Sequence, residues 1–423
     1  MSMKRCQVSV ASCILLFFLQ SWSSIVYAQS NNNQHREFQI GVFYGPTANL
    51  TNIKQFQWIK EANVDFIQYV GDVKILEPAA SEKRNLQLLD LAARVGLTYY
   101  VADPRIHDGE EGVAAVVNAY KDHPATAGYY IVDEPGIEGL DWAAKTYQMV
   151  RKLDPLRVPY VNLFPEQAVP EYETQYVHKW VEKAGKDALI YLSFDNYPFL
   201  VDGKFRDSNF NNLDIIRRAG LKYGVSTSSY LQSVGILGHY RRPSPADLRF
   251  SAYSNLSYGI KNLVWFTYNT PIGQPVEKFT NAIIDSLGNK TDLYKPFTKL
   301  NKELKQIGPV LMNLDAVAVH HSGEEKNPNI VPLPNDYFVR LLDKTDKFII
   351  TDFRDHNTNK RYLMLVNKAL KEPKKINFRV DGKVKLVKGP SKRSSLGRKK
   401  VGNEEFYIDQ FLPGEGKLYE ITQ

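Results

Sequence analysis

Two adjacent carboxylates, Asp133 and Glu134, end a short apolar run in this chain of 423 residues. Residues 129–132 have the composition of a buried strand, and Pro135 ends it because proline has no N–H to donate to a sheet. A carboxylic acid at the tip of an interior strand can protonate a leaving-group oxygen. Cleavage of a glycosidic bond requires this proton transfer, so the sequence predicts Glu134 as a general acid.

The elements that must position these acids alternate between strand and helix. Apolar, β-branched and aromatic runs are separated by amphipathic helical stretches. The eight expected strands are 39–44, 65–70, 98–102, 128–132, 158–163, 189–194, 223–228 and 262–268. This alternation predicts a (β/α)8 barrel over residues 38–311. A doubly wound sheet is the alternative, but no glycine-rich phosphate loop follows the first strand.

The pattern changes after the barrel. Residues 312–423 contain short alternating runs, with turn-forming pairs at Asp381-Gly382 and Pro413-Gly414. These features predict a C-terminal β-sandwich domain. We expect residues 388–400 to form a basic loop within it.

The first 28 residues have the pattern of a secretory signal peptide: Lys4 and Arg5 precede an apolar run, and small residues end at Ala28. A membrane anchor is the weaker alternative, because the apolar run is short and contains Ser and Gln. We therefore expect an exported chain, periplasmic or extracellular, without a stable membrane span after cleavage. Residues 29–37 are expected to be a flexible lead-in.

Cysteine content and charge limit the possible chemistry. Both cysteines, Cys6 and Cys13, lie in the predicted signal peptide, which argues against cysteine nucleophiles and zinc–thiolate sites in the mature chain. The histidines show no metal-ligand spacing, and we expect no metal and no organic cofactor. The net charge of +8 is concentrated in residues 360–400. A solvated face is one explanation, and an acidic polysaccharide partner is the other. Nucleic acid is not an expected partner.

Polar and aromatic side chains follow the expected strands. In a parallel barrel, the strand tips meet around one pocket. The predicted substrate-binding residues are Tyr44, Gln68, Asp103, Arg105, Asp133, Asn162, Tyr197, Gln232, Trp265 and Tyr268. Acids, amides and aromatic rings together suit a sugar. Structural alternatives remain: Asp103 also fits a turn, Trp265 and Tyr268 also fit a barrel plug, and Glu134 also fits an ion pair with Arg105.

One segment carries a family resemblance. Residues 128–135, Gly-Tyr-Tyr-Ile-Val-Asp-Glu-Pro, resemble the fourth-strand motif of the (β/α)8 glycoside hydrolases of clan A, in particular the family 42 β-galactosidase type. The resemblance implies that Glu134 is the general acid/base and that Asp133 stands where an asparagine often contacts the sugar. The predicted C-terminal sandwich is similar to the accessory domain of such secreted enzymes.

The sequence departs from that family at the seventh strand. The clan A nucleophile is a Glu at its tip, but residues 221–246 contain no Asp or Glu. Asp195, at the sixth strand, is our candidate for the second carboxylate, either as nucleophile or as the base of an inverting enzyme. It could instead orient a substrate group that itself attacks. Asp103 and Glu166 are reserve candidates.

The missing acid also leaves room for functions without catalysis. The main alternative to an enzyme is a non-catalytic carbohydrate-binding protein on a degenerate glycosidase barrel. A structural surface protein is a third possibility.

Overall fold

The computed structural model describes residues 37–68, 76–273, 276–323 and 327–422. The predicted signal peptide, 1–28, and all of the predicted lead-in except Glu37 lie outside the described residues. The described residues from Phe38 onward form one compact unit.

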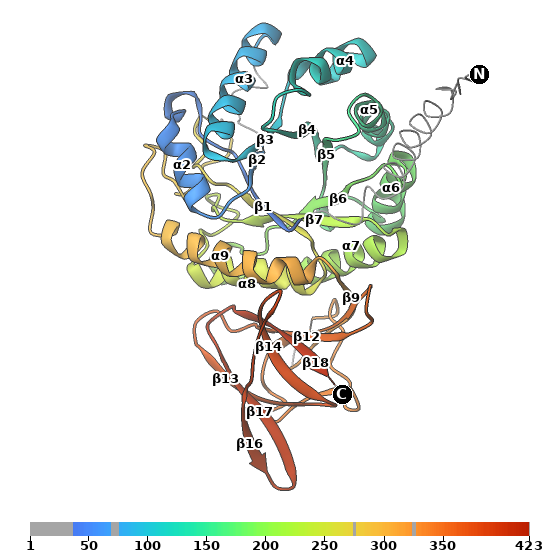
Figure 1. The fold of residues 1–423 in the computed structure, drawn as a ribbon, viewed down its shortest axis with the longest axis vertical. Coiled ribbons are helices and arrows are strands. Elements are labelled where there is room, and N and C mark those ends of the chain that lie inside the picture. Colours follow the sequence, from blue (N-terminus) through green and yellow to red (C-terminus); the bar gives the residue numbers. More distant parts are fainter. Residues whose placement is uncertain (1–36, 69–75, 274–275, 324–326, 423) are drawn as a thin grey trace, which may run out of the picture. The chain divides into compact units, whose positions relative to one another are not determined.

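Eight parallel strands form the closed barrel, each paired with the next and β8 with β1 (Figure 1). They are β1 (Gln39–Phe43), β2 (Phe66–Gln68), β3 (Thr98–Val101), β4 (Thr126–Asp133), β5 (Val158–Leu163), β6 (Tyr191–Asp195), β7 (Ser226–Gln232) and β8 (Asn262–Phe266). The strand residues are mostly buried and, except in β7, mostly apolar, which explains this arrangement because parallel strands are covered on both faces. The predicted barrel is confirmed.

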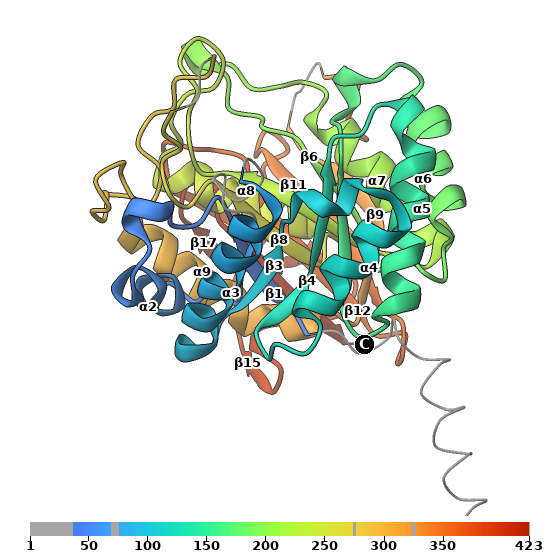
Figure 2. The ribbon, with the colours of Figure 1, turned by 90° about the horizontal axis from the view of Figure 1, so that it is seen from above.

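Helices surround the ring of strands (Figure 1). They are α2 (Ile53–Glu61), α3 (Pro78–Val95), α4 (Gly109–Tyr120), α5 (Leu140–Leu153), α6 (His178–Ala184), α7 (Asn209–Tyr223), α8 (Pro245–Ser257) and α9 (Tyr294–Leu311). Figure 2 shows α4, α5 and α6 side by side on one flank of the barrel. Local signals fix helix ends: Ser244 and Asp247 form a capping box on α8, and Gly96 ends α3 with φ of +72°.

Aromatic residues fill much of the barrel interior. The ring of Phe43 contacts those of Tyr130, Tyr230 and Phe266, with centroids 5.4 to 5.7 Å apart. The Tyr230 hydroxyl donates to Gln68 Oε1 at 2.6 Å. The interior is therefore a packed layer, and polar chemistry is confined to the strand tips and to a few buried hydroxyls.

Two antiparallel sheets follow the barrel. The first has the order β10-β13-β17-β16 and the second β15-β14-β18-β12-β11-β9. Their strands are β9 (Leu314–His321), β10 (Val339–Leu341), β11 (Phe348–Asp355), β12 (Arg361–Asn367), β13 (Lys374–Val380), β14 (Lys383–Gly389), β15 (Lys392–Ser394), β16 (Gly397–Val401), β17 (Glu404–Phe411) and β18 (Gly416–Thr422). Phe378 of one sheet and Tyr419 of the other share a core, as a sandwich requires.

The six-stranded sheet also packs against the barrel. Its residues Met364 and Leu418 belong to the same buried cluster as the barrel interior, and α8 and α9 contact β12 and β14. One prediction in this region is wrong: residues 388–400 include β15 and β16 rather than a continuous loop. Among the described residues, no helix is long and apolar enough to cross a membrane.

Candidate active site

Glu134 directly follows β4 and has a left-handed backbone, with φ of +48°. Its N–H donates to the Asn162 carbonyl at 2.8 Å, and the Pro135 carbonyl accepts from the Tyr176 hydroxyl at 2.6 Å. A non-glycine residue in this conformation before proline is strained by roughly 1–3 kcal/mol. The two hydrogen bonds hold the strained turn, which fixes the direction of the Glu134 side chain.

Asp195 ends β6 and lies beside Glu134. The two carboxyl groups are close enough for each to shift the pKa of the other. Asn162 lies between Asp195 and Asp133, and its Nδ2 donates to Oδ1 of each at 3.2 Å. Asp195 is 6% exposed, whereas Asp133 is exposed to solvent. The structure thus brings the predicted acids and Asn162 into one cluster.

The environment gives the two central carboxyls, Glu134 and Asp195, different pKa values. Burial raises the pKa of Glu134 well above its usual value, and the charges of Asp195 and Asp133 raise it further. Burial and the charge of Asp133 also raise the pKa of Asp195, but hydrogen bonds from Glu134 and Asn162 oppose this rise. Glu134 therefore keeps a proton when Asp195 has lost its own, which divides the pair into an acid and a carboxylate.

Aromatic rings form a wall beside the acids. Tyr197 stacks on Phe266 with ring centroids 4.9 Å apart and planes 21° apart, and Tyr240 contacts Tyr197 edge-on at 5.7 Å. Burial raises the pKa of Tyr197, and the charge of Asp195 is the next cause, which places this ring next to the acids. The Tyr240 hydroxyl accepts from Arg206 at 3.3 Å. Such a wall suits the C–H face of a pyranose.

Gln232 occupies the tip of β7, where the resembled family has its nucleophile. The side chain is 1% exposed. Its Oε1 accepts from Phe199 N–H at 3.0 Å, and its Nε2 donates to the carbonyls of Phe199 and Arg241 at 3.2 and 3.1 Å. Because backbone groups hold this amide, Gln232 fixes two loops of the barrel mouth. Its predicted role in substrate binding stays a prediction.

Asp103 and Arg105 form a buried structural pair. Asp103 accepts two hydrogen bonds from the Arg105 guanidinium, at 3.0 and 2.8 Å, and one from the Tyr120 hydroxyl at 2.6 Å. Arg105 also pairs with Glu82 of α3 at 2.8 Å. These partners lie on α3 and α4, so the two residues tie β3 to the helix layer. Their predicted role in substrate binding stays a prediction.

Trp265 and Tyr268 also face the helices. Trp265 donates its indole N–H to Asn301 of α9 at 3.1 Å, and both rings contact Phe297 of α9. Both side chains are fully buried. Alternation along β8 directs Phe266 inward instead, so the aromatic residue of this strand that lines the site is Phe266.

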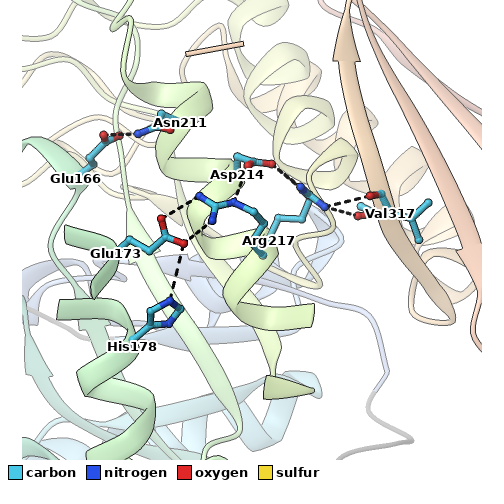
Figure 3. A network of polar contacts seen from close by, with 9 residues as sticks. Glu166, Glu173, His178, Asn211, Asp214, Arg217 and Val317 are labelled. Atoms are coloured by element: carbon cyan, nitrogen blue, oxygen red, sulfur yellow. Dashed lines mark hydrogen bonds and ion pairs between the residues drawn. The ribbon is translucent and has the colours of Figure 1, made fainter. Parts of the chain in front are cut away.

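The remaining predicted residues lie at the edge of the cluster or outside it. Tyr44 is 7% exposed and follows β1 with φ of +62°, and Gln68 is fully buried against Tyr230. Glu166, a reserve acid, lies in η5 (Glu166–Ala168) and accepts a hydrogen bond from Asn211 of α7, as Figure 3 shows. Its contacts therefore lie on the helix side.

Sequence reasoning missed Tyr240 and Glu277. Both lie in loops, after β7 and β8, where no strand-tip pattern marks them. Glu277 is exposed, and its charge contributes to the raised pKa of Glu134. Its loop is held over the barrel because Leu237 N–H donates to the Lys278 carbonyl at 2.9 Å. Within the described ranges, no group of three His, Cys, Asp or Glu residues could hold a metal ion.

Solved structures show the same architecture. A β-galactosidase from Bacillus circulans sp. alkalophilus matches with a TM-score of 0.60 and 9% identity over 91% of this chain and 99% of that one. Gan42B, a GH42 β-galactosidase from G. stearothermophilus, matches with 0.60 and 9% over 92% and 99%. A family 5 glycoside hydrolase from Bacteroides vulgatus matches with 0.56 and 12% over 93% and 92%. The fold is shared with glycoside hydrolases.

Sequence comparison adds no family assignment. No protein-family model matches the chain, and no curated protein sequence matches it. In the comparison of structures, the match to a β-galactosidase from the psychrophilic Marinomonas ef1 covers 65% of this chain and 62% of that protein, with a TM-score of 0.49 and 12% identity.

Proposed function

We propose that this protein is a glycoside hydrolase with Glu134 as general acid/base and Asp195 as nucleophile. The observation that carries the proposal is the buried pair itself. Two carboxyls lie close together at the tips of β4 and β6, on either side of β5, in surroundings that give them different proton affinities. The fold shared with GH42 and family 5 enzymes and the motif at 128–135 both support this reaction class, and we propose the family 42 type in particular.

The contact between Glu134 and Asp195 favours a retaining reaction. An inverting enzyme needs a water molecule between base and sugar, and its carboxyls are roughly 6.5–9.5 Å apart. Retaining pairs are about 5–5.5 Å apart, because the second carboxylate itself attacks. Glu134 and Asp195 lie close enough to shift each other's pKa, which supports the shorter separation, so Asp195 is proposed as nucleophile rather than base.

The reaction follows from these protonation states. Glu134 donates its proton to the glycosidic oxygen as the C1–O bond breaks, and the Asp195 carboxylate forms a bond to C1. The leaving alcohol departs, and Glu134 is now ionised. It takes a proton from a water molecule that attacks C1, which breaks the ester to Asp195 and releases the sugar. Both carboxyls return to their starting states.

The neighbouring residues would hold the sugar. Asp133 is exposed next to the pair and can accept hydrogen bonds from hydroxyls. The wall of Tyr197, Phe266 and Tyr240 would pack against the apolar face of the ring. β-Galactosides are the first substrates to test, because both TM-score 0.60 neighbours are β-galactosidases.

Export and an acidic polymer remain parts of the proposal. The leader pattern of residues 1–28 supports export to the periplasm or the cell exterior, and cell fractionation tests it. The exposed lysines of β14 to β16, among them Lys383, Lys399 and Lys400, support binding of an acidic polysaccharide. Salt-dependent retention on immobilised polygalacturonate tests this binding.

The function is tested by turnover of a panel of 4-nitrophenyl glycosides, including β-galactoside and β-galacturonide. Wild type should hydrolyse at least one of them, and Glu134→Gln should lower kcat/KM on the methyl glycoside of the same sugar by about 10³ to 10⁴, because general acid catalysis contributes about this much. Glu138→Gln, in the same loop but exposed, should retain wild-type turnover.

Two results would remove the proposal. Undiminished turnover of the methyl glycoside in Glu134→Gln would mean that this carboxyl donates no proton. Binding of a glycan by wild type without turnover of any glycoside would identify a carbohydrate-binding protein instead.

A further inference from the structure

A chain of buried polar groups leads from the barrel interior to the acids. Ser193 Oγ donates to Asn162 Oδ1 at 3.1 Å and lies 3.0 Å from the Tyr160 hydroxyl. The Tyr160 hydroxyl lies 2.6 Å from Ser228 Oγ, which accepts from Asn262 Nδ2 at 2.8 Å. Each of these five side chains is at most 3% exposed. An all-apolar interior would pack as well, so these groups call for an explanation.

The direction of this chain follows from the number of hydrogens. Asn262 Nδ2 can only donate, so Ser228 accepts there and donates its own hydrogen to Tyr160. Tyr160 then donates to Ser193. Ser193 has one hydrogen, and since an amide oxygen can only accept, that hydrogen goes to Asn162 Oδ1. With its oxygen held in this way, Asn162 must turn its N–H groups toward the mouth.

We propose that Ser193 is a positioning residue that fixes the Asn162 amide with its N–H groups on Asp133 and Asp195, so that Asp195 is ionised while Glu134 keeps its proton. Tyr160, Ser228 and Asn262 support it from below. The inference rests on the proposed function. It adds a structural reason why Asp195 is the nucleophile and Glu134 is the acid.

Without this anchor the amide can rotate and present its oxygen to Asp195. A carbonyl oxygen disfavours the ionised carboxylate, whereas an N–H favours it. The other groups that face Asp195 would not compensate, since they are acids or neutral phenols. They are Asp133, Glu134, Tyr172, Tyr176, Tyr197 and Tyr240.

The test is the pH profile of kcat/KM for Ser193→Ala on the best 4-nitrophenyl glycoside. Loss of the anchor should raise the pKa of the nucleophile, so the acidic limb should move up by about one pH unit. Tyr160→Phe should shift it less, because Ser193 keeps its own hydrogen. Ser229→Ala is the matched control: its hydroxyl is also buried, on β7, but bonds only the Tyr230 carbonyl. An unmoved limb in Ser193→Ala would overturn the proposal.

A second measurement does not need activity. The thermal unfolding midpoint is followed from pH 4 to 9 in all three variants. A raised pKa of Asp195 in the folded state makes stability fall as pH rises, so the deficit of Ser193→Ala relative to wild type should grow between about pH 6 and 8. A constant deficit would contradict the positioning role. A growing deficit in a protein that hydrolyses no glycoside would retain it and reject the proposed function alone.

Discussion

Asp195 is a carboxyl group that must lose its proton inside a barrel. At 6% exposure, with Asp133 nearby, the ionised form is disfavoured, and the pKa in the folded chain is raised above the value of about 4 expected in the unfolded chain. The folded state therefore binds more protons than the unfolded state at neutral pH, and stability falls as pH rises. The environment that gives the acid and the nucleophile different pKa values also destabilises the fold, as active sites often do.

This residue-scale argument predicts the effect of Asp195→Asn. The wild type should lose stability from about pH 4 to 7, between the pKa of Asp195 in the unfolded and in the folded chain, and the variant should lose less, by up to about 1.4 kcal/mol for each pH unit of this window. Urea unfolding at several pH values measures the slope. Asp336→Asn, which removes an exposed carboxylate, is the control and should keep the wild-type slope. Equal slopes in wild type and Asp195→Asn would show that Asp195 ionises as readily folded as unfolded.

At the scale of elements, the site could be predicted where the sequence marks the end of a strand. The βα period and the Asp133–Glu134–Pro135 ending were sufficient to place β4 and the barrel. The sequence shows less clearly whether a strand residue points into the barrel or toward the helices, because a strand buried on both faces shows no polar alternation. Trp265 was therefore assigned to the mouth, although it bonds Asn301 of α9.

Two strands and two loop residues were not predicted from the sequence, for different reasons. The lysine-rich strands β15 and β16 lack the apolar alternation that marks a strand, and lysine is common where a sheet edge is exposed. Glu277 and Tyr240 belong to loops whose course depends on contacts between distant segments, such as Leu237 with Lys278. No local pattern in the sequence records such contacts.

The assignment of the two faces of β8 leads to a paired prediction. Phe266→Ala removes a ring stacked on Tyr197 and should raise KM about tenfold, since such a contact contributes roughly 0.5–1.5 kcal/mol. Trp265→Phe should leave KM unchanged but lower stability by about 1–3 kcal/mol, because it leaves the buried Asn301 oxygen without its donor. Kinetics and urea unfolding of both variants measure these effects. The reverse outcome would place the Trp265 ring in the mouth.

On the scale of the whole molecule, the barrel and the C-terminal sheets are joined by polar as well as apolar contacts. Figure 3 shows Arg217 of α7 between Asp214 and β9. Its guanidinium donates to the carbonyls of Ala316 at 2.9 Å and Val317 at 3.5 Å. The neighbouring Arg218 pairs with Glu173 and Asp214 and has no such bond to β9.

Replacement of Arg217 should therefore weaken this junction. Arg217→Ala should destabilise the protein by about 1–2 kcal/mol, since hydrogen bonds from charged groups contribute more than neutral ones. Limited proteolysis should cut near residues 312–316 sooner than in wild type. Arg218→Ala, which loses only ion pairs that are partly exposed, should change stability by at most about 1 kcal/mol and leave the cleavage rate unchanged. Equal cleavage in both variants would mean that Arg217 does not secure β9.

The role of Glu134 as proton donor is tested most directly by how the kcat/KM loss of Glu134→Gln depends on the leaving group. An alkyl alkoxide needs a proton to depart, whereas a 2,4-dinitrophenolate does not. The Glu134→Gln variant should therefore lose about 10³ to 10⁴ in kcat/KM on a methyl glycoside and little on the dinitrophenyl glycoside of the same sugar. Equal losses on both substrates would contradict the assignment of Glu134 as the proton donor.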